Sequence, residues 1–145
     1  MESRGSVRIR SADPRAAPAI RYNYLATEND RRVMVEGLKL IRRIAAATPL
    51  RDYIVREEFP GPGVQTDADL LETVRQTGET VFHPTSTCRM GTDADSVVDS
   101  QLRVRGLQGL RVADASVMPA VVSGNTNAAV IAIAEKAADL IANPR

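Results

Sequence analysis

His83 and Cys88 are the residues of this sequence best suited to chemistry, and each is the only one of its type in the 145-residue chain. Histidine can take up or release a proton near neutral pH. His83 is therefore a candidate general base, a candidate metal ligand or a structural residue. A single cysteine rules out an internal disulfide and a metal site built from several thiolates. We expect no bound metal, and we expect Cys88 to be a buried, unreactive thiol.

Two polar segments further along the chain could contact a ligand. Residues 110–114 predict a short strand that ends in Asp114, and ligands of open α/β sheets bind beyond the carboxyl ends of strands. Residues 123–127 (SGNTN) stand directly before a long apolar stretch, and their types are those found at helix starts. The free N–H groups of a helix start suit an anion or a cofactor edge that becomes negative. Most helix starts that are rich in serine and asparagine are simple caps, so this pattern alone is a weak signal for a ligand.

A Ser-His-Asp hydrolase is the alternative that His83 leaves open. Ser86 and Ser123 are the serines to consider, but neither stands in the G-x-S-x-G pattern that presents a nucleophilic serine.

Hydrophobic periodicity and helix caps predict a mixed α and β structure around these residues. Alternation predicts strands at 6–10, half-buried, and at 20–25. Thr27 and Thr66, each followed by an acid three positions on, predict the starts of two helices. The first helix should run to about Ala47, and the second should bury Leu70, Leu71 and Val74. Short strands are expected at 97–98, 102–104 and 110–114, and a final helix at 127–142, apolar on most faces and therefore buried.

Composition limits the classes of partner. Hydrophobic residues make up 43% and charged residues 26%, which indicates about one folded domain. A net charge of +1 and an aromatic content of 3% argue against nucleic acid. Since no apolar run reaches the roughly 20 residues of a membrane span and the start lacks a signal sequence, we expect no transmembrane segment. We expect a cytoplasmic protein; peripheral attachment to the inner membrane stays open.

Three segments in order resemble the C-terminal signature of the glucose–methanol–choline (GMC) flavoprotein oxidoreductases. They are HPTSTCRMG from residue 83, VVDSQLRVRGLQGLRVADASVMP from residue 97 and SGNTNAAVIAIAEKAADLI from residue 123. The beginning of the chain resembles the family segment just upstream, so the likeness extends over almost the whole chain. It is closest to the choline-dehydrogenase-like and alcohol-dehydrogenase-like branch.

The resemblance implies FAD-dependent oxidation of a small-molecule alcohol by hydride transfer to the flavin. His83 matches the catalytic base, and Asn125 matches the second active-site position, which hydrogen-bonds the alcohol oxygen. Asp114 and Ala115 match the segment near the ribityl and pyrophosphate part of FAD. Thr126 and Asn127 match the helix start that faces the pyrimidine edge of the flavin.

The resemblance also implies an α+β fold in two parts. Residues 1–92 would belong to an antiparallel-sheet, substrate-side lobe that includes the His83 loop. Residues 93–145 would supply the last parallel strand and the closing helix of the FAD-binding domain. The G-x-G-x-x-G segment that holds FAD in the family is absent, so we expect a C-terminal fragment, a truncated product or half of a split enzyme. It would be inactive without its N-terminal FAD-binding portion, supplied in cis or in trans. The alternative is a non-catalytic remnant or interaction module.

Overall fold

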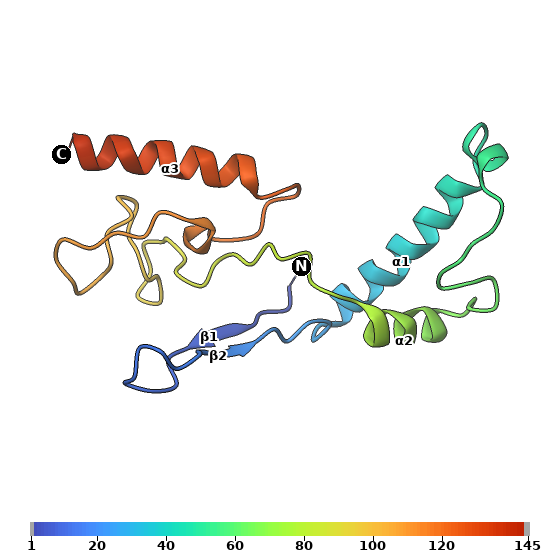
Figure 1. The fold of residues 1–145 in the computed structure, drawn as a ribbon, viewed down its shortest axis with the longest axis horizontal. Helices are drawn as coiled ribbons and strands as arrows, with labels where there is room; N and C mark the ends of the chain where they lie inside the picture. The colour runs from blue at the N-terminus through green and yellow to red at the C-terminus, as the bar shows by residue number, and fades with distance from the viewer. Residues whose placement is uncertain (1, 144–145) are drawn as a thin grey trace. The chain divides into compact units, whose positions relative to one another are not determined.

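The computed structural model describes residues 2–143, which belong to two compact units, Met1–Glu79 and Thr80–Arg145. The first unit contains a hairpin and two helices, and the second contains a long loop region and one helix (Figure 1). The structure is therefore mixed helix and small antiparallel sheet, as the sequence predicts.

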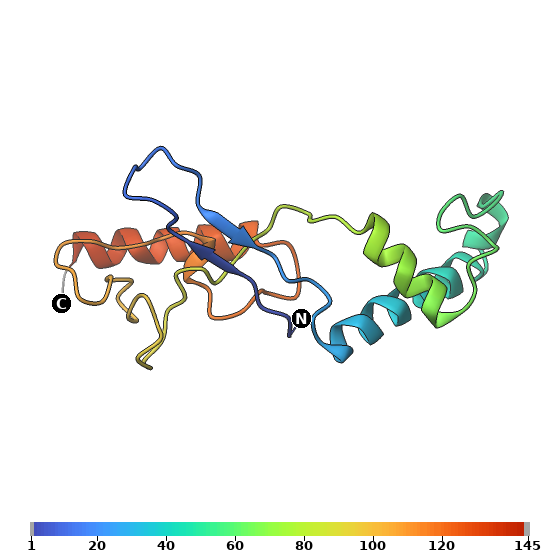
Figure 2. The ribbon, with the colours of Figure 1, turned by 90° about the horizontal axis from the view of Figure 1, so that it is seen from below.

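A short hairpin forms the only regular sheet among residues 2–143. Strand β1 (Ser6–Arg8) pairs antiparallel with β2 (Ala19–Arg21) (Figure 2). Val7 lies opposite Ile20 in this pairing. Both predicted strands are too long. The first ends before Ile9, which is 91% exposed rather than half-buried. The second ends because Asn23 and Leu25 have φ angles of 57° and 56°, a left-handed conformation that an extended strand does not contain.

Helix α1 (Glu28–Ala45) begins as its capping residue predicts and ends close to the predicted Ala47. The hydroxyl of Thr27 accepts the backbone N–H of Asp30 at 3.2 Å. Buried Asp30 in turn accepts the N–H groups of Glu2 and Ser3 at 2.9 and 2.7 Å. The hydroxyl and backbone N–H of Ser3, with the N–H of Glu2, lower the pKa of Asp30 to about 2. The charged carboxylate therefore ties the start of the chain to α1.

Helix α2 (Asp67–Thr77) follows the second predicted cap and packs against α1. Thr66 accepts the N–H of Asp69 at 3.1 Å. Leu70 is completely buried, while Leu71 and Val74 are half-buried, so the predicted inward face is confirmed. Two 3-10 turns complete the helical elements, η1 (Leu50–Tyr53) and η2 (Ala115–Val117).

The predicted strands of the second unit do not form. Residues 97–98, 102–104 and 110–114 make only isolated bridges, which join Val98 to Met90 and Val104 and join Arg103 to Arg111. A strand needs a hydrogen-bonded neighbour along its length, and residues 110–114 have only the antiparallel bridge at Arg111. The small core of this unit is built from the buried residues Val98, Leu102, Val117 and Ala137.

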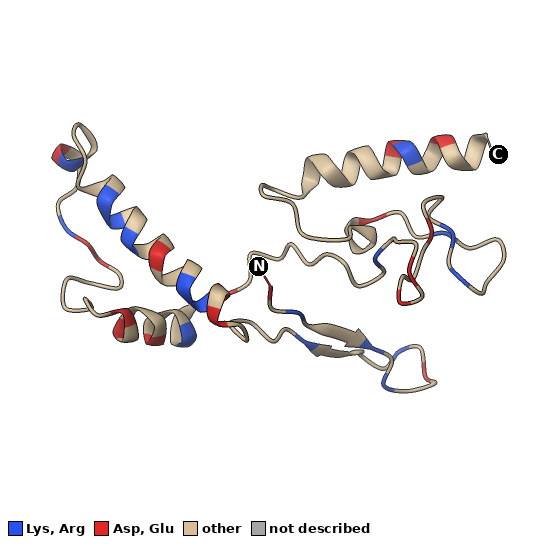
Figure 3. Cartoon of the chain, turned by 180° about the vertical axis from the view of Figure 1, so that it is seen from behind, with Lys and Arg blue, Asp and Glu red and all other residues tan. Residues whose placement is uncertain are grey.

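Helix α3 (Asn127–Ala142) has the bounds that the sequence predicts, but its predicted burial is wrong. Only Ala137 and Leu140 are buried, and Ile131 and Ile141 are 54% and 59% exposed. Its charged residues, Glu135, Lys136 and Asp139, all lie in the C-terminal half (Figure 3). The first half of α3 therefore presents uncharged side chains.

Candidate functional site

His83 lies in a loop whose backbone is held in an unusual conformation. Phe82 before it has a φ of 58°, and Ser86 after it has a φ of 70°. Left-handed φ values are uncommon outside glycine and cost about 1–3 kcal/mol each. Such residues cluster at functional sites, where the surrounding structure holds them. The conformation of the loop is thus an observation in favour of a role for His83.

The loop that follows His83 is fastened to the segment at η2. Ser86, Cys88 and Met90 donate their N–H groups to the carbonyls of Ala115, Ser116 and Val117, at 3.4, 3.0 and 2.8 Å. Alternate residues of one segment bond to successive residues of the other. Because Val117 is completely buried, the fastening point is anchored in the core of the unit.

Asp114 and Ala115, the predicted flavin-facing residues of this segment, have structural contacts as well. The carboxylate of Asp114 accepts the N–H of Ser116 at 2.7 Å and so begins η2. Ala115 provides the carbonyl that accepts from Ser86. Neither residue contacts the imidazole of His83, but both hold the loop that carries it.

The imidazole of His83 contacts both residues that precede α3. Its Nε2 lies 3.4 Å from Nδ2 of Asn125, and its Nδ1 lies 3.2 Å from Oγ1 of Thr126. His83 and Asn125 are exposed, whereas Thr126 is buried. The structure therefore brings together two predicted site residues that are 42 positions apart in the sequence.

The orientation of the Asn125 amide follows from its other hydrogen bond. Its Oδ1 accepts the backbone N–H of Asn127 at 2.9 Å, so the NH₂ end faces His83. An NH₂ group can only donate. Nε2 of His83 must then be the acceptor, which means that this nitrogen carries the lone pair that a general base uses.

This arrangement can bind and deprotonate a hydroxyl group. An oxygen about 2.9 Å from both Nε2 and Nδ2 would donate its proton to the imidazole and accept a hydrogen bond from the amide. The two nitrogen atoms are close enough for one oxygen to reach both. Asn125 can stabilise a developing negative charge on that oxygen without adding a charge of its own.

The start of α3 offers further N–H donors beside this pair. Asn127 donates to Asn125, and Val130 donates to the carbonyl of Thr126 at 3.0 Å. Within residues 2–143, no acceptor takes the N–H groups of Ala128 and Ala129. These groups lie at the positive end of the helix dipole. The donors at this helix start therefore fit an electron-rich group such as the edge of a flavin, whereas the N–H of Asn127 is taken by Asn125 and the hydroxyl of Thr126 contacts His83.

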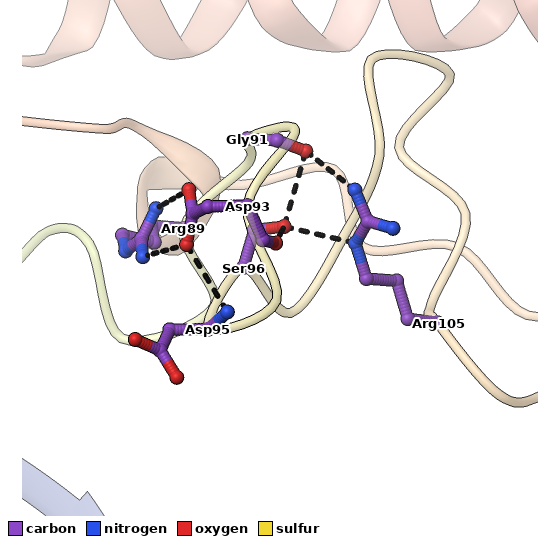
Figure 4. Close-up of polar contacts among 6 residues, drawn as sticks. All are labelled: Arg89, Gly91, Asp93, Asp95, Ser96 and Arg105. Atoms are coloured by element: carbon purple, nitrogen blue, oxygen red, sulfur yellow. Dashed lines mark hydrogen bonds and ion pairs between the residues drawn. The ribbon is translucent and has the colours of Figure 1, made fainter.

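A second polar network stiffens the loop beyond Met90 (Figure 4). Arg89 donates to both carboxylate oxygens of Asp93 at 2.9 and 2.6 Å, and this contact holds the pKa of Asp93 well below its usual range. Arg105 donates to Oγ of Ser96 and to the carbonyl of Gly91, at 2.8 and 2.7 Å. Sequence reasoning missed this network, because a four-residue spacing such as that of Arg89 and Asp93 indicates an ion pair only on a helix, and residues 89–93 lie in a loop.

The hydrolase alternative requires a hydrogen bond between a serine hydroxyl and the imidazole of His83. The hydroxyl of Ser86 bonds to that of Thr85 at 3.2 Å. Across the described part of the chain, the imidazole of His83 has only Asn125 and Thr126 as side-chain hydrogen-bond partners. Neither Ser86 nor Ser123 is therefore positioned for activation by His83.

Comparisons with known proteins agree with these segments. Residues 1–134 match the sequence profile of the family described as GMC oxidoreductase. The chain is 51% identical over 139 residues to an oxygen-dependent choline dehydrogenase of Serratia proteamaculans. The matched region is 96% of this chain and 25% of that protein. The chain therefore spans about a quarter of the length of the curated relatives that it matches.

Solved structures give the same result. A crystal structure of pyridoxine 4-oxidase from Mesorbium loti matches 100% of this chain and 28% of its own, with a TM-score of 0.92 and 37% identity. An FAD-dependent oxidoreductase from Chaetomium thermophilum matches 94% of this chain and 24% of its own, with a TM-score of 0.87 and 35% identity.

None of the helices described between residues 2 and 143 has the length and apolar character needed to cross a membrane. The profile match, the curated relative and the two structures lead to one conclusion: this chain belongs to the GMC oxidoreductase family.

Proposed function

We propose that this chain supplies the catalytic pair of an FAD-dependent enzyme that oxidises an alcohol. The observation that carries the proposal is the contact between Nε2 of His83 and Nδ2 of Asn125 at 3.4 Å. A proton acceptor and a neutral hydrogen-bond donor then meet at one point, which is what removal of a hydroxyl proton requires.

In the proposed reaction, His83 takes the proton of the substrate hydroxyl at Nε2. Asn125 donates from Nδ2 to the same oxygen and holds it as negative charge develops there. Bound FAD would supply the acceptor for the hydride that leaves the alcohol carbon. The N–H groups of Ala128 and Ala129, at the positive end of α3, would stabilise the added negative charge by about 0.3–2 kcal/mol.

The remainder of the enzyme must come from outside residues 1–145, in cis or in trans. We assign residues 1–92 to the substrate-side lobe and residues 93–145 to the end of the FAD-binding domain. The substrate is a small alcohol, and choline is the first to test because the curated relative is an oxygen-dependent choline dehydrogenase.

Complementation tests the proposal. The chain is produced together with the part of the Serratia proteamaculans relative that it does not match, as a separate polypeptide. We call the product the complemented enzyme. We expect flavin absorbance to co-purify with the pair and to bleach when choline or another small alcohol is added without oxygen.

Two controls make the test specific. The remainder of the relative alone should not bleach with alcohol, because it lacks His83 and Asn125. The Asn125→Ala variant should bind flavin but lose roughly 10²–10³ of the reduction rate, as expected for one lost donor at a developing oxyanion. Pairs that never acquire flavin would favour the interaction-module alternative instead.

A further inference from the structure

The hydroxyl of Thr126 is turned away from its own helix. Threonine before a helix normally accepts a backbone N–H from the first turn. Thr27 and Thr66 do so in this chain, at 3.2 and 3.1 Å. Thr126 also stands directly before α3, but its backbone is already helical (φ −73°, ψ −16°) and its side chain makes no such bond. Its side chain is buried, and its Oγ1 lies 3.2 Å from Nδ1 of His83.

Asn125 takes over the capping role that Thr126 gives up. Its Oδ1 accepts the N–H of Asn127, which fixes the NH₂ group toward Nε2 of His83. Because Nε2 is the acceptor in that contact, the proton of the neutral ring resides on Nδ1. The Nδ1–H group then donates to the hydroxyl oxygen of Thr126.

We propose that Thr126 is a positioning residue that, together with the Asn125 amide, holds His83 as the Nδ1–H tautomer and so keeps Nε2 unprotonated as the base. The inference rests on the function proposed above. A neutral imidazole can carry its proton on either nitrogen, and the partner of one nitrogen decides which. Without an acceptor at Nδ1, the ring can rotate out of its contact with Asn125 and place its proton on Nε2. A protonated Nε2 cannot accept the proton of an alcohol.

The same contact serves both states of the ring. When Nε2 takes the proton of the substrate hydroxyl, the Nδ1–H bond to Thr126 is unchanged. The resulting imidazolium donates from both nitrogens, to Thr126 and to the substrate oxygen. Thr126 therefore orients the ring before proton transfer and stabilises it afterwards, without touching the substrate.

Three variants isolate the hydroxyl of Thr126. Thr126→Val keeps the branched shape and removes the oxygen, whereas Thr126→Ser keeps the oxygen and removes a methyl group. Thr85→Val is the matched control, because its hydroxyl bonds only to Ser86 in the same loop. Thermal unfolding of each variant shows whether its fold is retained.

The first measurement is independent of activity. His83 is the only histidine of the chain, so ¹⁵N-histidine labelling gives the ring signals of His83 alone, in the free chain or bound to the unlabelled remainder of the complemented enzyme. We expect the Nδ1–H tautomer in the unmodified chain, in Thr126→Ser and in Thr85→Val, and a shift toward Nε2–H in Thr126→Val. A proton on Nε2 in the unmodified chain, or on Nδ1 in Thr126→Val, would overturn the inference.

The second measurement is the rate of flavin reduction by alcohol in the complemented enzyme. Thr126→Val should lower the limiting rate roughly 10–100-fold with little change in the alcohol concentration at half-saturation, and Thr126→Ser should recover most of it. A rate for Thr126→Val within twofold of the unmodified enzyme would overturn the inference. If the complemented enzyme reduces no flavin at all, the proposed function fails while the tautomer measurement still decides the position of the proton.

Discussion

Replacing His83 separates the chemical role of its ring from the structural one. In the complemented enzyme, His83→Ala removes the acceptor at Nε2, and loss of a general base costs about 10²–10⁴ in rate. At about 1.4 kcal/mol per factor of ten, the barrier rises by about 3–5 kcal/mol. The measurement is anaerobic stopped-flow absorbance of the flavin at saturating alcohol.

The stability of the variant should change by a different amount. His83→Ala also leaves the buried hydroxyl of Thr126 without its partner, and such a group costs about 1–3 kcal/mol. Exposed Asn125 can bond to water instead. His83→Gln offers a polar group to Thr126 but no base, so it should match His83→Ala in rate while unfolding closer to the unmodified chain.

The pair of variants can refute the assignment in two ways. Reduction rates within a few-fold of the unmodified enzyme in both variants would show that His83 is not the base. A full rate in His83→Gln alone would show that hydrogen bonding at this position suffices. In the first case, the contact with Asn125 would be structural; in the second, His83 would act as a hydrogen-bonding group and not as a base.

Three further substitutions test the fold of the two units, each by itself. Gly5→Ala should destabilise the hairpin by about 1–3 kcal/mol, because the added Cβ would collide with the backbone oxygens of Arg21 and Tyr22. Urea unfolding followed by tyrosine fluorescence measures the change in the free energy of unfolding. An unchanged free energy of unfolding would contradict the close packing at Gly5. Val117→Ala should lower the free energy of unfolding by about 1.5–3 kcal/mol, because Val117 is completely buried. A loss below about 0.5 kcal/mol is typical of a surface residue and would contradict the burial of Val117. Asp30→Asn tests the pH dependence. The pKa of Asp30 is lowered from 3.8 to about 2 in the folded chain, so its stabilisation is complete above about pH 4 and is lost as the pH falls through 2. Urea midpoints of the two proteins should differ at pH 7 and converge below pH 2, and a constant difference would contradict the linkage.

The helices could be predicted because their signals are local. Thr27 and Thr66 each stand before an acidic first turn, and both helices begin directly after them. The strands could not be predicted in the same way, because a strand is completed by neighbours that its own sequence does not specify. Residues 110–114 have a strand-like pattern but only one bridging residue, Arg111.

The candidate site also has one part that could be predicted from the sequence and one part that could not. The resemblance to GMC oxidoreductases predicted His83 and Asn125, and the structure brings their side chains together, while their catalytic roles stay a prediction. The resemblance named Thr126 as a flavin-facing residue, and nothing in the sequence indicated its contact with His83. The local rule pointed the other way, since a threonine before a helix is expected to cap that helix.

The wrong prediction for α3 bears on how the site is held. A helix that is apolar on most faces is normally buried, yet Ile131 and Ile141 are more than half exposed. Because the chain spans about a quarter of its curated relatives, we infer that the surface covering these residues belongs to the remainder of the enzyme. Thr126, which contacts His83, stands directly before this helix. A surface that covers α3 would therefore also restrain Thr126, the proposed partner of the His83 ring, and would strengthen the Nδ1–H tautomer that the free chain is expected to show.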